Sequence, residues 1–179
     1  MLESQLALRL QPLEIRLNLG ITIKQGESIE GKNSKIMKNL TAGIYIKSTD
    51  ALNGSILENT TILLVKHNAA GSIGFVTNKP LYKSLHQLKE FNTSKPFPLM
   101  DGGPVDIEHL FVLHKRPDLI SGGEQITNDL YLGGNMEQVI EAINNKGANN
   151  QDIQLFIGYC GWDTGELEAE IEEGSWAFC

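Results

Sequence analysis

Alternation of hydrophobic and polar residues marks the first predicted strand. Leucine and isoleucine occupy every second position between residues 13 and 19, as in a strand with one buried face. The stretch QGESIEGKNSK (25–35) is rich in Gly, Ser and charged residues and predicts a linker. We therefore expect residues 1–37 to form an arm outside the main domain. This arm either adds a strand to the body, pairs with another subunit or stays mobile.

The pattern becomes denser after residue 43 and predicts a series of strands. GIYIKS (43–48) and TILLVKH (61–67) both have strand character, and the second is almost entirely apolar, as in a strand covered on both faces. NAAG (68–71) supplies turn residues before SIGFVTN (72–78), which predicts a β-hairpin. Pro80 ends this strand because proline lacks the backbone donor that a ladder needs.

Two stretches have the spacing of a helix. Apolar residues recur at intervals of three and four between residues 81 and 91. The clearer helix is NMEQVIEAINNKG (135–147), which has an apolar stripe on one face. Asn135 can cap its N-terminus, with Gln138 at the reciprocal capping position. Gly147 suits the left-handed conformation in which helices often end.

Strands and helices are mixed along the chain without regular alternation. Further strands are predicted at HLFVLH (109–114), QITNDLYL (125–132), DIQLFIGY (152–159) and SWAF (175–178). This order favours an α+β fold over a doubly wound parallel sheet. A chain of 179 residues with 41% hydrophobic residues fits a single domain with a substantial core.

The charge of the chain is distributed unevenly. The formal net charge is −7, from 15 basic and 22 acidic residues. Residues 147–179 hold seven acidic and no basic residues, so the rest of the chain, with 15 of each, is neutral. A protein that neutralises DNA phosphates needs a basic face, so this balance argues against direct nucleic-acid binding. The most basic sector, residues 66–95, is interpreted as ordinary solvated surface.

The composition of the chain also indicates in which cellular compartment the protein is expected. No apolar run approaches the roughly 20 residues that a membrane-spanning helix needs, and the N-terminus does not have the pattern of a signal peptide. Cys160 and Cys179 show no spacing typical of a disulfide framework or a metal site. We therefore expect a cytoplasmic protein with two reduced thiols and no membrane association.

Six acidic residues stand between the two tryptophans of the C-terminal segment GYCGWDTGELEAEIEEGSWAFC (158–179). Asp163 is a candidate N-cap of a short helix, and Glu166 completes an arrangement like a capping box. Helical spacing puts Leu167 and Ile171 on one narrow apolar stripe, with the carboxylates spread around the remaining faces. We expect these carboxylates to be solvated, or to be matched by the lysines of residues 66–95 or by cations of a partner, rather than to bind a metal.

The two tryptophans, Trp162 and Trp176, flank this predicted helix. Large aromatic residues usually belong to the core, and the alternative is that these two line a groove for a partner. Cys160 lies in GYCGW, between a predicted strand and a predicted helix, where some hydrolases carry a nucleophile. The match to that motif is weak, and a buried, inert cysteine is the favoured interpretation.

The DGGPV segment (101–105) contains two glycines followed by a proline. Exposed backbone N–H groups in such a turn can bind an anion, although a tight turn that allows close backbone packing is the favoured interpretation. His109 and His114 are five residues apart and point to opposite faces of a strand, so they are a poor metal-binding pair. Glycine-rich nucleotide motifs are absent. The sequence therefore predicts no metal, no cofactor and no catalytic set.

Five motifs in this order resemble the AlgH (YqgE) family of bacterial proteins. They are HNAAGSIGFVTNKP (67–80), DGGPV (101–105), FVLH (111–114), ITNDLYLGGNMEQV (126–139) and GYCGWDTGELEAEIEEGSW (158–176). The resemblance implies one domain over residues 38–179, with a mixed sheet curled into a partial barrel and helices packed outside. This chain has Glu166 where the family often has Gln, and Cys160 where Ala or Ser is common.

The resemblance also guides the expected function. The family is usually cytoplasmic and is called a transcriptional regulator by name, without an established reaction. We expect a non-enzymatic interaction or regulatory domain that acts through a protein or a small ligand, and both a monomer and a homo-oligomer remain open. The alternative is a hydrolase or nuclease with a pocket between the GGPV turn and the GYCGW-helix region. Candidate ligand- or partner-binding residues are Asn78, Gly102, Gly103, Pro104, His114, Tyr159, Trp162, Glu166, Glu170 and Trp176.

Overall fold

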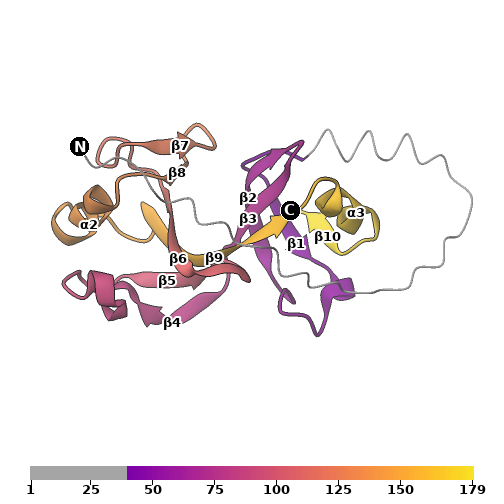
Figure 1. Cartoon of the computed structure of the whole chain (residues 1–179), viewed down its shortest axis with the longest axis horizontal. Coiled ribbons are helices and arrows are strands. Elements are labelled where there is room, and N and C mark those ends of the chain that lie inside the picture. The colour runs from indigo at the N-terminus through magenta and orange to yellow at the C-terminus, as the bar shows by residue number, and fades with distance from the viewer. Residues whose placement is uncertain (1–39) are drawn as a thin grey trace, which may run out of the picture.

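The computed structural model describes residues 40–179, in which strands outnumber helices (Figure 1). Both the predicted strand at residues 13–19 and the predicted linker lie outside the described residues, and the domain boundary at residue 37 stays a prediction. The strands are β1 (Tyr45–Ser48), β2 (Thr61–Asn68), β3 (Gly71–Val76), β4 (Pro80–Ser84), β5 (Pro98–Asp101), β6 (Val105–His114), β7 (Gly123–Gln125), β8 (Tyr131–Gly133), β9 (Ile153–Trp162) and β10 (Trp176–Phe178). The helices are α2 (Met136–Asn145) and α3 (Glu166–Glu172), and short 3-10 turns are η1 (Asp50–Leu52), η2 (Leu85–Gln87) and η3 (Lys89–Phe91).

Strand β9 connects the two ends of the sheet. The strand order is β10-β1-β2-β3-β9-β6-β8-β7, and β5 branches from β9 and carries β4. All pairings are antiparallel except that of β5 with β9. One half of β9 pairs with β5 and β6, and its last residues pair with β3. The result is a curled, largely antiparallel half-barrel.

The two helices lie at opposite ends of the molecule, α2 beside β6 to β8 and α3 beside β1 and β10 (Figure 1). The α+β class and the curled sheet agree with the expectation from the sequence. The expectation of helices packed around the outside of a barrel is not confirmed. Neither helix of the described region has the length and apolarity that a bilayer crossing requires.

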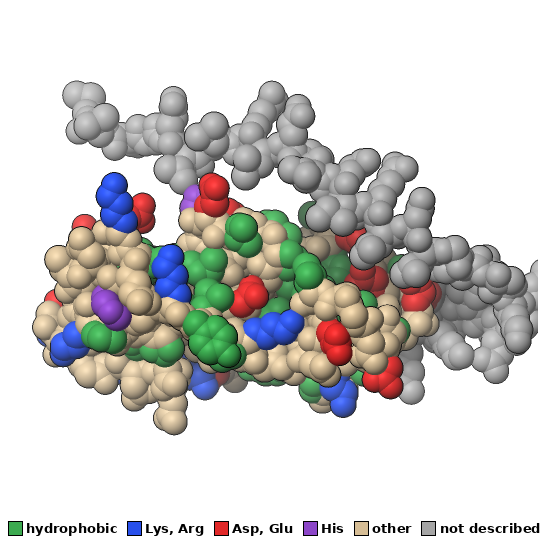
Figure 2. Space-filling model, turned by 90° about the horizontal axis from the view of Figure 1, so that it is seen from below, with side chains coloured by type: hydrophobic (Ala, Val, Ile, Leu, Met, Phe, Trp, Pro, Cys, Tyr) green, Lys and Arg blue, Asp and Glu red, His purple; other side chains and the backbone are tan. Residues whose placement is uncertain are grey.

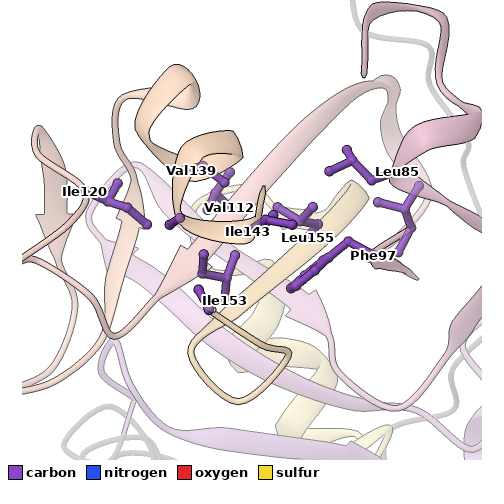
Figure 3. Close-up of a cluster of buried hydrophobic side chains, with 11 residues drawn as sticks. Leu85, Phe97, Val112, Ile120, Val139, Ile143, Ile153 and Leu155 are labelled. Carbon is purple, nitrogen blue, oxygen red and sulfur yellow. The ribbon is translucent and has the colours of Figure 1, made fainter. Parts of the chain in front are cut away.

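The core consists of three clusters of buried side chains. The first lies under α2, where Val139 and Ile143 pack on residues of β6 and β9 (Figure 3). The second lies under α3, and the third lies between β2, β3, β6 and β9. Strand β2 contributes to the second and third clusters, because Ile62 and Leu64 point to the second cluster and Leu63 and Val65 point to the third. This confirms that β2 is covered on both faces.

The predicted helix over residues 81–91 is wrong. Residues 80–84 form β4, and the remainder forms the two 3-10 turns η2 and η3. The apolar residues Leu85, Leu88 and Phe91 are separated by intervals of three, which is the period of a 3-10 helix rather than an α-helix.

Two further elements differ in extent from the sequence prediction. The stretch 125–132 is not one strand but the end of β7, a turn closed by the hydrogen bond from Ile126 N–H to Leu130 O (2.8 Å), and the start of β8. Helix α2 begins as predicted, with Asn135 Oδ1 accepting a hydrogen bond from Gln138 N–H (3.0 Å). The Gln138 side chain does not complete a capping box, since its Oε1 accepts hydrogen bonds from the backbone N–H and the hydroxyl of Ser121.

Candidate functional site

The sequence predicts GYCGW as the connection between a strand and a helix. In the structure the whole segment belongs to strand β9. Ser72 of β3 pairs with Trp162 at the end of this strand. After Asp163 the chain turns into α3, whose N-cap residue is Gly165 in the left-handed conformation (φ 78°). The prediction of Asp163 as the N-cap is therefore wrong. Only half of the capping box is present, in which Glu166 Oε2 accepts from Asp163 N–H (2.8 Å).

Glu170 binds both tryptophans of the chain. Its Oε2 accepts one hydrogen bond from Trp162 Nε1 (2.8 Å) and another from Trp176 Nε1 (2.6 Å). The two indole rings meet edge to face, with centroids 5.9 Å apart. We call these three side chains the Trp–Glu–Trp clamp. It ties the last strand, the preceding strand β9 and α3 together.

The clamp changes the interpretation of three predicted site residues. Trp162 is 7% exposed and Trp176 is 2% exposed, and both belong to the core cluster under α3. They therefore pack in the core rather than lining a surface groove. Glu170 turns inward to the indole N–H groups, so the expectation that all the α3 carboxylates fan outward is wrong for this residue.

Four of the remaining acidic side chains of this region are exposed, and Glu168 is half-buried. Asp163, Glu166, Glu172 and Glu173 all lie on the surface, whereas Leu167 is fully buried beneath the helix. Within residues 40–179, no Lys or Arg forms a salt bridge with any of these carboxylates. The same part of the chain contains no group of three His, Cys, Asp or Glu side chains arranged to hold a metal ion.

The GGPV turn packs directly on β9. Gly102 and Gly103 are both buried, and their backbone N–H groups donate to Ile157 O (2.8 Å) and Asp101 Oδ1 (3.3 Å). A Cβ atom on Gly102 would lie 2.2 Å from Gly158 O. Since both N–H groups have partners inside the protein, they are not presented to an anion. Close backbone packing is what the two glycines permit.

Pro104 and Asn78 lie on the surface beside this turn. Pro104 is exposed. Asn78 uses its side chain to bond backbone, accepting from Thr61 N–H (2.9 Å) and donating to Asn59 O (2.8 Å). Asn78 therefore fixes the start of β2, and its amide groups are engaged within the chain.

Tyr159 is half-buried beside an irregularity in β6. Its ring packs edge to face on Phe111 (5.5 Å), and burial together with the nearby negative charge of Asp106 raises the pKa of its hydroxyl. The register of β6 on β9 shifts between Val105 and Leu110, so residues 106–109 bulge from the sheet. Asp106 adopts a left-handed conformation in this bulge.

Cys160 does not have the properties of a nucleophile. Its side chain is 2% exposed, its Sγ contacts Gly102 O (3.7 Å), and burial raises the pKa of the thiol to about 12. A thiol that stays protonated and shielded does not react readily with electrophiles. The interpretation of Cys160 as an inert core residue is consistent with this environment.

This difference between the two cysteines leads to a measurable prediction. Both cysteines are free, and Cys179 is exposed. We expect the native protein to react rapidly with Ellman's reagent at about one thiol per chain, with the second thiol released only by denaturant. Cys179→Ser should abolish the rapid reaction. Rapid reaction of Cys160 in that variant would contradict its assignment to the core.

His114 lies far from the other predicted site residues. It pairs with Ile153 at the start of β9, whereas Trp162 ends that strand, about 30 Å further along an extended chain. Its ring is buried and stacks on Tyr131 (5.5 Å). Nδ1 accepts from Arg116 N–H (3.2 Å), Nε2 has no partner within residues 40–179, and burial lowers the pKa. His114 is therefore a neutral, internal side chain at neutral pH.

The sequence interpretation missed a polar contact between the β2–β3 hairpin and α3. His67 Nδ1 lies 2.8 Å from Ser72 Oγ, and His67 Nε2 lies 3.8 Å from Glu168 Oε1. The hairpin prediction already places His67 opposite Ser72, but no local pattern indicates Glu168. Ser72 is only 3% exposed, so its hydroxyl is not accessible to a substrate. We assign this contact to the docking of α3 on the hairpin.

A cavity lies elsewhere in the described part of the molecule. It has a volume of about 530 Å³ and includes residues of β1, β2, β6 and β9 and of the segments 127–130 and 150–152. Of the predicted site residues, only His114 lines it. The enzyme alternative expected a pocket between the GGPV turn and GYCGW. The cavity described above is not in that position, and the GGPV turn itself is packed against β9.

Fold and motifs together define a curled-sheet domain with a glycine turn packed on its central strand and a Trp–Glu–Trp clamp at its C-terminal end. The family model described as DUF179, AlgH-like, matches residues 44–179. The chain belongs to this AlgH-like family.

Relatives and solved structures agree with this assignment. A UPF0301 protein of Chlorobium luteolum is 38% identical over 139 residues, which cover 78% of this chain and 74% of that protein. The UPF0301 protein CT0663 of Chlorobaculum tepidum is 41% identical over 120 residues, covering 66% of this chain and 64% of that protein. The solution structure of AlgH from Pseudomonas aeruginosa superposes with a TM-score of 0.63 at 22% identity, covering 88% of this chain and 80% of that chain. The crystal structure of DIP2367 from Corynebacterium diphtheriae superposes with a TM-score of 0.58 at 16% identity, covering 79% of this chain and 76% of that chain.

Proposed function

We propose that this protein is a non-enzymatic binding domain that recognises a basic segment of a partner protein through the outer face of α3. The observation that carries the proposal is the set of exposed carboxylates on a helix whose inner face is fixed by the clamp. Asp163, Glu166, Glu172 and Glu173 are the exposed acidic side chains, and we call them the acidic face. Leu167 and Glu170 hold the helix from below.

The charge arrangement supports a partner rather than a purely structural role. Glu168 and Glu172 are like charges four residues apart on α3 and repel one another, and Glu172 and Glu173 stand at the C-terminal end, where the helix dipole disfavours negative charge. Within residues 40–179 no Lys or Arg offsets this cost. A cationic partner segment would remove the repulsion and gain favourable charge contacts.

A regulatory role would then act through protein contact and not through direct binding of nucleic acid. The charge balance of the chain supports this, as does the face in Figure 2, where Lys and Arg side chains are separated and alternate with acidic ones. Such a surface lacks the continuous basic stripe that phosphate neutralisation requires. The two free thiols support a cytoplasmic setting, since reduced cysteines are typical of that compartment.

A matched pair of double variants tests the acidic face. Glu172→Gln/Glu173→Gln removes two charges from it, and Glu137→Gln/Glu141→Gln removes two exposed charges from α2. We expect the first variant to weaken binding of a fluorescent octalysine peptide about five-fold or more, and the second to change it less than about two-fold. Fluorescence anisotropy at low salt measures both, and added salt should weaken the wild-type interaction.

Two outcomes would overturn this assignment. If both double variants lost affinity equally, the peptide would be sensing net charge and not the acidic face. If wild-type protein did not bind the peptide at low salt, the charge argument itself would be wrong. Capture of partners from a bacterial lysate with the same variants then identifies the natural basic segment.

A further inference from the structure

The cavity of about 530 Å³ is separate from the acidic face, and its lining has two distinct parts. Leu63 and Leu113 are buried members of the third core cluster, and with Leu130 they form an apolar base. This is the place where the third core cluster reaches the surface. A volume of this size is within the range of small-molecule sites.

Three amide side chains in the polar part of the lining make no hydrogen bond within the described residues. Gln154 pairs with Leu113 across the β6–β9 ladder, so its side chain lies on the cavity side of the sheet, opposite to the buried Leu155. Within the described residues its amide makes no hydrogen bond, and neither do the side-chain amides of Asn150 and Gln151. An amide group both donates and accepts, so this wall offers both kinds of hydrogen bond at once.

The charges around the cavity exclude one large class of ligands. Among the described residues of the lining Lys115 is the single Lys or Arg, and its Nζ is already 3.5 Å from Asp129 Oδ2. Asp129 also accepts from the Thr127 hydroxyl (3.0 Å), and Asp152 adds a second carboxylate. The lining residues within 40–179 therefore carry a formal charge of −1 from one Lys and two Asp. A phosphate or carboxylate ligand would meet no unengaged cation here.

We propose that this cavity binds a neutral, hydroxyl-rich small molecule of the sugar or polyol class. A hydroxyl group donates and accepts, and so matches the mixed character of the Gln154, Gln151 and Asn150 amides. The CH face of a sugar ring fits the leucine base, and the Tyr45 ring, 44% exposed at the edge of the cavity, can cover it. This site is independent of the proposed binding of a basic segment by α3.

Titration of the isotope-labelled full chain by NMR tests the proposal. The probes are glucose, galactose, ribose, glycerol and myo-inositol, each added to about 50 mM, which detects dissociation constants in the millimolar range. We expect at least one to shift the side-chain amide signal of Gln154 and the backbone signals of residues 127–130 and 150–154. Glucose 6-phosphate should bind at least about five-fold more weakly than glucose if glucose binds, because its phosphate adds charge repulsion.

Matched variants locate the site. Gln154→Leu keeps the size of the side chain and removes its hydrogen bonds, so we expect binding to weaken about ten-fold. Gln125→Leu, at an exposed position on β7 outside the cavity, should leave binding unchanged. If Gln154→Leu does not fold, the double variant Asn150→Ala/Gln151→Ala at exposed positions replaces it. The proposal is overturned if no probe shifts these signals, if binding survives the cavity variants, or if the phosphorylated sugar binds more tightly.

Discussion

Replacing Glu170 with alanine is expected to destabilise the protein by about 3–5 kcal/mol, because two buried indole N–H groups lose their common acceptor. Each N–H is within 2.8 Å of the same carboxylate oxygen, and no replacement acceptor is bonded to either indole within residues 40–179. Glu170→Gln keeps an oxygen at the same place but removes the charge. Its expected cost is smaller, about 1–2 kcal/mol, since hydrogen bonds to a charged acceptor are roughly twice as strong as neutral ones.

Urea unfolding followed by tryptophan fluorescence measures this effect at the clamp itself. The chain contains two tryptophans, and both belong to the clamp, so the emission reports this site and no other. Glu172→Gln on the same helix serves as the control and should change the free energy of unfolding by no more than about 0.5 kcal/mol. Equal stability of Glu170→Ala and this control would show that the indole groups do not depend on Glu170.

Gly102→Ala is expected to cost about 3 kcal/mol or more, because the new methyl group has no space. Its Cβ would stand 2.2 Å from Gly158 O, 3.0 Å from Phe156 Cβ and 3.1 Å from Phe75 Cδ1. The nearest of these atoms belongs to the backbone of β9 and cannot rotate away. The strand or the turn must move, which disturbs the pairing of β9 with its neighbours.

A second glycine separates this steric effect from backbone strain. Gly122 has a φ of +80°, and a Cβ there would meet nothing within 4 Å. Gly122→Ala should therefore cost only the penalty of a left-handed alanine, about 1–2 kcal/mol. Thermal or urea unfolding of both variants gives the comparison. A smaller loss for Gly102→Ala than for Gly122→Ala would mean that the GGPV turn is not held against β9 as described.

Local pattern was sufficient for much of the fold. The β2–β3 hairpin follows from NAAG between two apolar stretches, and Asn135 caps α2 as its residue type predicts. The helix predicted over residues 81–91 was wrong because apolar residues three apart fit a 3-10 helix as well as an α-helix. Pro96 and Pro98 give no local indication that β4 pairs with β5. The strand predicted at residues 152–159 was too short, since GYCGW was taken as the connection to a helix capped by Asp163, whereas β9 continues to Trp162.

The candidate site was harder to predict because it depends on contacts between distant segments. Residue type alone placed Trp162 and Trp176 either in the core or in a groove, and only the fold brings Glu170 beneath both indoles. The cavity near Gln154 was missed altogether. Its lining comes from β1, β2, β6 and β9, and no short motif contains these residues together.

The position of β9 in the chain has a consequence for how the protein is made. Three other strands pair with β9, yet it spans residues 153–162 and all three of them precede it in the chain. During synthesis, strands β3, β5 and β6 leave the ribosome long before their shared neighbour exists. The nascent chain therefore exposes unpaired strand edges until residues 153–162 have been made, and this is when it most needs protection from association with other chains.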